Sequence, residues 1–259
     1  MIKEEYDKMY EFEDHYWWYR GLHELVRYYV AKTGEERKKR KESNDSSDEP
    51  LKIFDAGCGT GRMLELLSEY GAVEGVDYSP EAIALCRKRG LRRVETCDLN
   101  LWESPPDVYD VIISNDVICT SGVTDDLAVL RKFHTALKPG GRLVLNFPAF
   151  TVLSRIHDIA VSGIRRYRKK KTVRALEEMD FRIVRANYRL PALFVFILFQ
   201  KYILGLFPRD ESKNVTSDLK PLPSWLNRLL FFMNRLENRL FTCGVPFLFG
   251  SSLFIVCKK

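Results

Sequence analysis

The sequence predicts an α/β protein: a seven-stranded, mostly parallel sheet with helices on both faces and a helical hydrophobic insertion before the last strand. Between residues 51 and 146, short apolar segments alternate with helical segments, which is typical of a parallel sheet covered by helices. Two more strand-like segments follow, and far more residues separate them than a hairpin turn requires. The 259 residues suit one domain with such an insertion.

The individual elements follow from local patterns in chain order. Residues 1–32 are expected to form an N-terminal helical cap, because apolar side chains between Leu22 and Val30 recur at helical spacing. Residues 33–50 contain no large apolar side chain, which predicts a charged linker. The core is expected to span 51–189, the insertion 190–248, and the last strand 249–259. Predicted strands occupy 51–55, 73–77, 93–96, 108–114, 141–146, 181–188 and 251–257, and predicted helices between the first strands occupy 61–70, 80–89 and 125–137.

The insertion has two apolar parts. Residues 190–207 are almost wholly apolar and approach the length of a membrane-spanning helix, with Pro191 and Gly205 near the ends. Residues 224–241 predict an amphipathic helix with Ser224 as its N-cap. The expected apolar side carries Trp225, Leu226, Leu229, Leu230, Met233, Leu236 and Leu240, and the other side carries Asn227, Arg228, Asn234, Arg235, Asn238 and Arg239 together with Phe231.

Charge and cysteine content narrow the class of protein further. The net charge of +6 is mild, but basic residues concentrate between 155 and 174, where Asp158 is the only acid. The six cysteines include no C-x-x-C pair, so we expect neither a metal site nor a disulfide framework, but buried thiols in a reducing cytosol. The first residues are polar and aromatic rather than a signal peptide, which predicts a cytoplasmic location.

The segment "LKIFDAGCGTG", at 51–61, joins a predicted strand to a predicted helix through a glycine-rich turn. Such a turn lets the backbone approach a ligand, and the helix that follows offers free N–H groups. Dinucleotide-binding loops use G-x-G-x-x-G, whereas here Gly57, Gly59 and Gly61 alternate and Asp55 precedes them. Because a carboxylate repels a pyrophosphate, this loop favours a ligand that carries an ammonium group.

Together with three later segments, this loop resembles class I S-adenosylmethionine-dependent methyltransferases, which have a Rossmann-like fold. The segments "VEGVDYSPEAI", "VETCDLN" and "YDVIISNDVICT" each contain the end of a predicted strand, and "VLRKFHTALKPGGRLVLNFP" matches the family's helix, Pro-Gly-Gly turn and fifth strand. The resemblance covers 51–147 and implies S-adenosyl-L-methionine as cofactor, with Asp77 on the ribose hydroxyls and Asp98 at the adenine. The implied cofactor-binding residues are Asp55, Gly57, Cys58, Gly59, Gly61, Asp77, Tyr78, Asp98, Leu99, Asn115 and Asp116.

Beyond residue 150 the sequence resembles a bacterial and archaeal subgroup with an H-D…R-R-Y signature, often linked to cell-surface glycan assembly. Here "IHDIAVSGIRRY" carries the signature, and "EDHYWWYRG" matches the subgroup's aromatic N-terminal stretch. His157 is our candidate catalytic base, and Asp158 either orients it or acts itself; the alternative is a surface or helix-capping pair. Trp17 and Arg20 are expected to close over the cofactor, although such aromatic stretches also form cores.

Subfamily motifs and charge indicate the acceptor. Residues 115–118 read Asn-Asp-Val-Ile, not the N/D-P-P-Y motif of enzymes that methylate exocyclic base amines, and the double-glutamate loop of arginine methyltransferases is absent. Residues 155–174 are basic and 190–241 are apolar or amphipathic, a combination that suits peripheral contact with an anionic membrane surface. We therefore expect O-methylation of a lipid-linked or amphiphilic, glycan-type acceptor at the cytoplasmic membrane face.

Other readings of the chain stay open. A soluble methyltransferase for a small hydrophobic metabolite would use the insertion as a lid over its acceptor. An RNA methyltransferase would use the basic residues on phosphates, and a non-enzymatic protein would bind the cofactor alone. Residues 190–207 can equally form a buried helix or a dimer interface. DNA is not an expected partner, and the sequence does not specify the oligomeric state.

Overall fold

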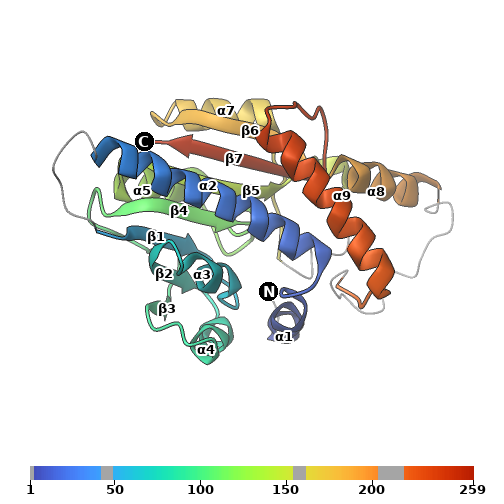
Figure 1. Ribbon diagram of the computed structural model, residues 1–259, viewed down its shortest axis with the longest axis horizontal. Coiled ribbons are helices and arrows are strands. Elements are labelled where there is room, and N and C mark those ends of the chain that lie inside the picture. The colour runs from blue at the N-terminus through green and yellow to red at the C-terminus, as the bar shows by residue number, and fades with distance from the viewer. Residues whose placement is uncertain (1–2, 42–48, 154–161, 204–218) are drawn as a thin grey trace.

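The computed structural model describes residues 3–41, 49–153, 162–203 and 219–259. It contains a seven-stranded sheet in the order β3-β2-β1-β4-β5-β7-β6, with helices on both faces (Figure 1). The strands are β1 (Leu51–Ala56), β2 (Gly71–Asp77), β3 (Val94–Thr96), β4 (Tyr109–Asn115), β5 (Leu137–Pro148), β6 (Arg182–Arg189) and β7 (Ser252–Lys258). The helices are α1 (Lys3–Phe12), α2 (Trp17–Lys41), α3 (Arg62–Leu67), α4 (Pro80–Lys88), α5 (Asp126–Ala136), α7 (Lys169–Glu177), α8 (Pro191–Ile203) and α9 (Ser224–Thr242), with a 3-10 turn at Thr151–Leu153.

The strand order confirms the predicted fold class and brings the functional loops to one edge. The pairs β1–β2, β1–β4, β2–β3 and β4–β5 are parallel, so these strands end at the same edge of the sheet. β7 runs antiparallel to both β5 and β6, and β6 therefore ends at this edge too. β2 and β4 flank β1 on opposite sides, so the direction in which successive strands are added reverses at β1. Open α/β sheets bind their ligands beyond the carboxyl ends at such a switch point.

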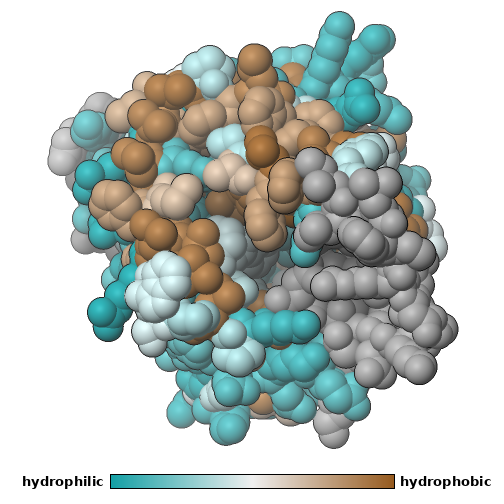
Figure 2. All heavy atoms as spheres, turned by 90° about the vertical axis from the view of Figure 1, so that its right-hand side faces the viewer, coloured by the Kyte–Doolittle hydropathy of each residue, from teal (hydrophilic) through white to brown (hydrophobic). Residues whose placement is uncertain are grey.

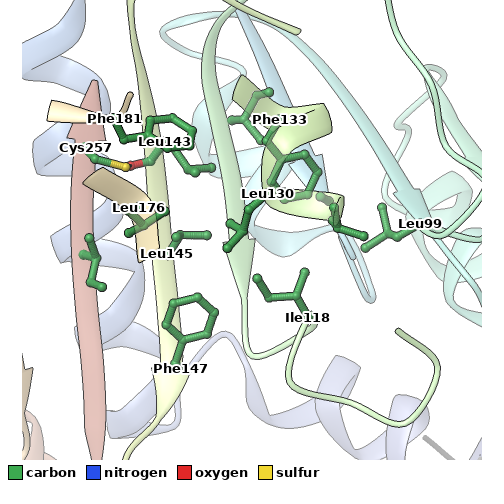
Figure 3. Packing of buried hydrophobic residues seen from close by; sticks show 14 of the residues in the cluster. Leu99, Ile118, Leu130, Phe133, Leu143, Leu145, Phe147, Leu176, Phe181 and Cys257 are labelled. Atoms are coloured by element: carbon green, nitrogen blue, oxygen red, sulfur yellow. The ribbon is translucent and has the colours of Figure 1, made fainter. Parts of the chain in front are cut away.

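Apolar side chains form a core on each face of the sheet. Figure 3 shows one of them, where Leu130 and Phe133 of α5 and Leu176 of α7 lie beside Leu143 and Leu145 of β5. Successive strand residues point to opposite faces, so the intervening residues of the same strands belong to the other core. That second core contains Val144 and packs under α2 and α9. Both faces are covered, which explains the nearly continuous apolar strands of the sequence.

The long helix α2 corrects the predicted linker, because residues 33–41 continue the helix. The reason lies on the sheet: Arg142 of β5 is 1% exposed and needs partners. It donates to the Thr33 hydroxyl at 3.0 Å, and its Nη2 lies 2.5 Å from Glu36. Glu36 also pairs with Lys258 of β7 at 2.6 Å. The polar residues of this segment therefore hold the helix on the sheet, so a lack of apolar side chains is not evidence of a linker here.

Exchange of Glu36 for glutamine is expected to lower the free energy of unfolding by about 1–2 kcal/mol. The change leaves Arg142 and Lys258 without a counter-charge, and the cost stays below that of a fully buried pair because Glu36 is partly exposed. Burial acts to raise the pKa of Glu36, but the hydrogen bonds and charges of Lys258 and Arg142 outweigh it and lower the pKa. The stabilisation is therefore present above the ordinary glutamate pKa and is lost as the pH falls through the lowered one.

Urea unfolding at neutral and acidic pH measures this effect, with Glu35→Gln as the control. Glu35 is the exposed neighbour on the same helix, so its exchange should leave the unfolding midpoint unchanged. Equal midpoints for the two variants at neutral pH would mean that Glu36 does not hold the helix in place.

Helix α9 packs against α2 through polar side chains. The Oδ1 atom of Asn227 accepts a hydrogen bond from the Trp17 backbone N–H at 2.9 Å, and Asn238 donates to the Gly21 carbonyl at 2.8 Å. Asn234 is buried between them, and a Cβ atom on Gly21 would lie 2.0 Å from its side chain. Glycine thus permits the close approach of the two helices. The predicted helix is confirmed. It begins at Ser224, and its N-cap is Pro223 and not Ser224 as predicted.

Candidate cofactor and acceptor site

The glycine-rich turn after β1, residues 57–61, is the cradle of the candidate site, and Gly57 and Gly59 bring no side chain to it. Gly57 and Gly59 have positive φ angles of 88° and 54°, which a side chain would strain. A Cβ atom on Gly57 would lie 2.2 Å from the Val117 side chain, and one on Gly59 would lie 2.6 Å from Met9 Cε. The turn is held against β2, because the Gly57 N–H donates to the Val76 carbonyl of that strand at 2.8 Å. Glycine is therefore required here by conformation and by space.

Asp55, at the end of β1, is buried and carries an oxygen with no hydrogen-bond partner among the described residues. Burial, reinforced by the nearby charge of Asp77, raises the pKa of Asp55 to about 7. A buried oxygen without a hydrogen-bond partner lowers the stability of the folded protein. A ligand that brings an N–H donor or a positive charge restores that stability. This atom and the bare glycine cradle fit a small ligand with an ammonium group, as the sequence predicts.

Asp77, at the end of β2, connects the cradle to helix α1. One of its oxygens accepts from the Gly59 backbone N–H at 2.9 Å, and the other accepts from the Ser79 N–H at 3.0 Å. The second oxygen also accepts from the Tyr6 hydroxyl of α1, at 3.0 Å. Tyr6 therefore makes the kind of contact that the resemblance assigns to a ribose hydroxyl, and Met9, one turn along α1, lies over Gly59.

A second group of contacts holds α1 over the site. Arg89, which follows α4, pairs with Glu13 at 2.7 Å, and Glu13 also accepts from the Thr60 hydroxyl of the glycine-rich turn. The Arg89 guanidinium lies 4.3 Å from the centre of the Tyr10 ring. Burial raises the pKa of Glu13 despite the opposing hydrogen bond from Thr60 and the charge of Arg89. The N-terminal segment is thus attached directly to the cofactor loop.

Three other predicted cofactor residues have local contacts. Asp98 accepts from the backbone N–H of Asn100 at 2.8 Å and from its side-chain amide at 2.6 Å. Leu99 is buried in the core, whereas the Tyr78 side chain is 74% exposed. Their roles toward the cofactor stay predictions, because contacts within one loop neither support nor exclude them.

Cys58 lies within the turn and is buried. Its sulfur is 3.8 Å from that of Cys86, and the Cys86 thiol donates to the Gly59 carbonyl at 3.2 Å. The hydrogen bond with Cys86 and burial raise the pKa of Cys58, so its thiol stays protonated. This thiol serves packing, as expected of a small residue in the turn.

Asn115 and Asp116 end β4 beside the cradle. Asp116 adopts a left-handed conformation with φ of 56°, and its Oδ2 accepts from Asn146 of β5 at 2.7 Å. Burial raises the pKa of Asp116 to about 6, against the hydrogen bond from Asn146 and the charges of Arg189 and Arg166. The side-chain oxygen of Asn115 is buried without a partner among the described residues. The Asn115 oxygen is therefore available to a ligand at this strand end, beside the Asp116 carboxylate that Asn146 holds.

The remaining predicted residues are not brought to the cradle by the contacts in the structure. Trp17 is buried and bonds to Asn227 of α9, and the Arg20 guanidinium lies 3.7 Å from the centre of the Phe231 ring. Both contacts are with α9, so the cofactor role of these two residues stays a prediction. His157 and Asp158 lie outside the described residues.

Sequence reasoning missed part of the site on both sides of the cradle. Tyr6 and Met9 on α1 and Glu13 just after it were overlooked, although their spacing of three and four residues was a usable signal of one helical face. Asn146 and Arg189 were overlooked at the ends of β5 and β6. No local signal marks them, because they meet only through the strand order of the finished sheet.

Comparisons with known proteins identify the family of this chain. A model of the family described as "Methyltransferase domain" matches residues 47–179, just over half of the chain. Trans-aconitate 2-methyltransferase of Rhodopseudomonas palustris is 36% identical over 104 residues, which is 38% of this chain and 39% of the relative. Ubiquinone biosynthesis O-methyltransferase of Xanthomonas campestris is 30% identical over 103 residues, 37% of this chain and 42% of the relative. The matches thus span about two fifths of the length of these relatives.

Solved structures share the fold. An S-adenosylmethionine-dependent methyltransferase from Mesorhizobium loti matches with a TM-score of 0.54 and 19% identity, over 82% of this chain and 92% of that one. Phosphoethanolamine N-methyltransferase 2 from Haemonchus contortus, solved with S-adenosyl-L-methionine, has a TM-score of 0.51 and 20% identity, over 85% of this chain and 50% of that one. On its sequence match and its fold, this chain belongs to the family of S-adenosylmethionine-dependent methyltransferases.

Proposed function

We propose that this chain methylates an oxygen atom of an amphiphilic, lipid-linked, glycan-type acceptor at the cytoplasmic face of a membrane. Bound S-adenosylmethionine supplies a methyl group that its sulfonium already activates. The protein must then hold the donor, align the acceptor and exclude water. One relative is named as an O-methyltransferase, which supports oxygen as the acceptor atom.

Three features of the cradle support the donor half of this proposal. Asp55 offers a buried carboxylate oxygen to the ammonium group, and Asp77 exchanges the hydrogen bond from the Tyr6 hydroxyl for one from the ribose. The backbone of Gly57 and Gly59 allows close approach, and α1 covers the loop from the solvent side through Met9. The site is therefore suited to hold a cationic nucleoside in a dry environment.

The outward face of α8 and α9 is the observation that carries the acceptor half. Because α9 turns its asparagines toward α2, its apolar side chains point away from the protein. Figure 2 looks at the side of the molecule where these helices lie, and hydrophobic atoms gather on it. The exposed apolar residues of the two helices are Val195, Phe196, Phe199, Tyr202, Trp225, Leu229, Phe232, Met233, Leu236 and Leu240.

This apolar face has the composition of a membrane-surface element. Two of its aromatic residues, Trp225 and Phe232, are 68% and 66% exposed. Arg228 and Arg239 are exposed on the same helix and provide positive charge. Basic and large apolar side chains on one exposed helix favour the interface of an anionic bilayer. None of the helices in the described ranges is both long enough and apolar enough to span a membrane.

A soluble methyltransferase for a small molecule is the second candidate. The names of two relatives, a trans-aconitate and a ubiquinone biosynthesis enzyme, favour small-molecule acceptors. In that case α8 and α9 cover the acceptor, or a second copy of the chain covers their apolar faces. An RNA acceptor ranks below both, because it leaves those apolar faces without a use. His157 and Asp158 are our candidates for the base and its orienting partner in either enzyme.

Vesicle flotation tests the membrane half of the proposal. The full chain should float with vesicles of phosphatidylcholine and phosphatidylglycerol, and Phe232→Ser/Leu236→Ser should weaken its partitioning about tenfold or more, because two side chains no longer enter the bilayer. The matched control is Leu101→Ser/Val184→Ser, which removes two exposed apolar residues elsewhere. Equal flotation of both variants contradicts the assignment. Wild-type protein that stays unbound and sediments as a dimer assigns the face to a second copy instead.

Transfer of a labelled methyl group tests the acceptor. Label from S-adenosylmethionine should enter the lipid-extractable fraction when the chain is incubated with membrane extracts. Separate incubations with water-soluble metabolites and with RNA provide the comparison. Label in the metabolite fraction alone would favour the second candidate.

A further inference from the structure

Arg189, the last residue of β6, has an unusual setting for a buried arginine. It is 3% exposed and lies at the carboxyl edge of the sheet, under α9. Its two hydrogen bonds within the described residues are long and go to neutral amides, at 3.4 Å to Asn146 and 3.5 Å to Asn234. Its Nε atom has no partner there. A buried guanidinium normally requires an anion and well-formed hydrogen bonds.

Two other arginines have close carboxylate partners. Arg142 is buried and also lacks a partner at Nε, but it lies 2.5 Å from the Glu36 carboxylate. Arg89, whose side chain is 7% exposed, lies 2.7 Å from Glu13 and 3.1 Å from Glu65. Arg189 takes part in none of the ion pairs found in the described residues, so it lacks the close carboxylate that these two arginines have.

Two acids lie near enough for their charges to act on Arg189, but neither pairs with it. These are Asp116 and Glu237, and burial raises the pKa of the first to about 6 and of the second to about 7. Burial also lowers the pKa of Arg189 to about 10, so it remains charged at neutral pH. The cluster of Arg189, Asp116, Glu237, Asn146 and Asn234 contains no ion pair to the guanidinium within the described residues, and it leaves the Arg189 Nε atom without a partner there. Arg189 therefore has unfilled donor capacity for an anion.

The position of this cluster relates it to methyl transfer. Asn146 contacts Arg189 with its Oδ1 and donates to Asp116 with its Nδ2. The next residue, Val117, lies against Gly57 of the cofactor cradle. A continuous set of contacts thus leads from the donor loop to Arg189. Acceptors bind beyond the carboxyl ends of the strands in open α/β sheets, where this cluster lies.

We infer that Arg189 binds an oxyanion of the methyl acceptor, a carboxylate or a phosphate, and thereby holds the acceptor beside the donor. The oxyanion takes the place of the two long amide contacts and forms a bidentate pair with the guanidinium. Asn146 and Asn234 keep the hydrogen bonds that their amide nitrogens donate to Asp116 and to the Trp17 carbonyl. This inference rests on the proposed methyltransferase function and specifies the acceptor class at that site.

The test uses the full chain saturated with S-adenosylhomocysteine, so that the donor site is filled by the product. Inorganic phosphate and acetate are titrated in separate arms at constant ionic strength, and the melting temperature is recorded. One or both anions should raise it in the wild type, and Arg189→Met should need at least tenfold more anion for the same shift. The arm that responds distinguishes phosphate from carboxylate. Binding of S-adenosylhomocysteine itself should be unchanged in the variant.

Two further variants keep the test decisive. Arg185→Met removes an arginine of the same strand that bonds to the Val245 carbonyl instead, and it should respond to anions like the wild type. Arg189→Lys keeps the charge without the bidentate geometry and should give an anion response between those of the wild type and Arg189→Met. If Arg189→Met does not fold, the weaker response of Arg189→Lys relative to the wild type provides the test. An unchanged response of Arg189→Met, an equal loss in Arg185→Met, or no anion response in the wild type overturns the inference. Failure of the wild type to bind S-adenosylhomocysteine would instead refute the proposed function.

Discussion

Asp77→Asn is expected to weaken the binding of S-adenosylmethionine about 100-fold. The carboxylate is positioned by the Gly59 and Ser79 backbone N–H groups, and a ribose hydroxyl takes the place of the Tyr6 hydroxyl on it. Two hydrogen bonds from ribose hydroxyls to a charged acceptor contribute about 1.5–3 kcal/mol each, and the amide keeps only part of this. Calorimetric titration of the purified chain with the cofactor and with its demethylated product measures the loss.

Tyr6→Phe is the control for this prediction, because Tyr6 donates to the same carboxylate. Phenylalanine keeps the packing of α1 but removes the hydroxyl. Cofactor binding should persist in this variant, or strengthen if the hydroxyl competes with the ribose. If Tyr6→Phe weakens binding as much as Asp77→Asn does, the carboxylate acts by holding α1 and not by holding the cofactor.

The sequence was sufficient to predict the sheet because its signals are local. Most strands contain a short apolar run, and glycines mark the turn between β1 and α3 and the Pro-Gly-Gly segment of β5, so the observed strands begin and end within a few residues of the expected ones. The positions of Asp55 and Asp77 were predictable for the same reason, because both stand at strand ends within recognisable motifs. Local pattern and final position coincide in this half of the chain.

The rest of the site could not be predicted because it depends on contacts between distant segments. The N-terminal segment reaches the cradle through Tyr6 and Glu13, whose partners are more than forty residues away in the sequence. Arg189 meets Asn146 only because β7 inserts between β5 and β6. The orientation of α9 is a further case, because its polar side faces the protein and its apolar side faces outward. A hydrophobic pattern gives the two sides of a helix but does not say which one the protein covers.

Asp55→Asn is expected to have opposite effects on stability and on cofactor binding. The folded protein raises the pKa of Asp55 to about 7 from an ordinary 3.8, by burial first and by the charge of Asp77 second. The raised value means that the folded state prefers the protonated form. Its stabilising effect is complete below the ordinary pKa and is lost as the pH rises through 7. At pH 8 the ionised Asp55 side chain destabilises the folded state, so Asp55→Asn should raise the free energy of unfolding by about 2–4 kcal/mol.

Binding depends on the other protonation state. The ammonium group of the cofactor needs an ionised Asp55, so the affinity of the wild type should fall as the pH drops below about 7. Asp55→Asn should bind about 100-fold more weakly at pH 8 and lose this pH dependence, because no titrating acceptor remains. Calorimetric titrations and urea unfolding between pH 6 and 8 measure both effects. If Asp55→Asn raises the free energy of unfolding but weakens cofactor binding, Asp55 serves the ligand and lowers the stability of the folded protein. A variant that is both less stable and normal in binding would make Asp55 a structural residue.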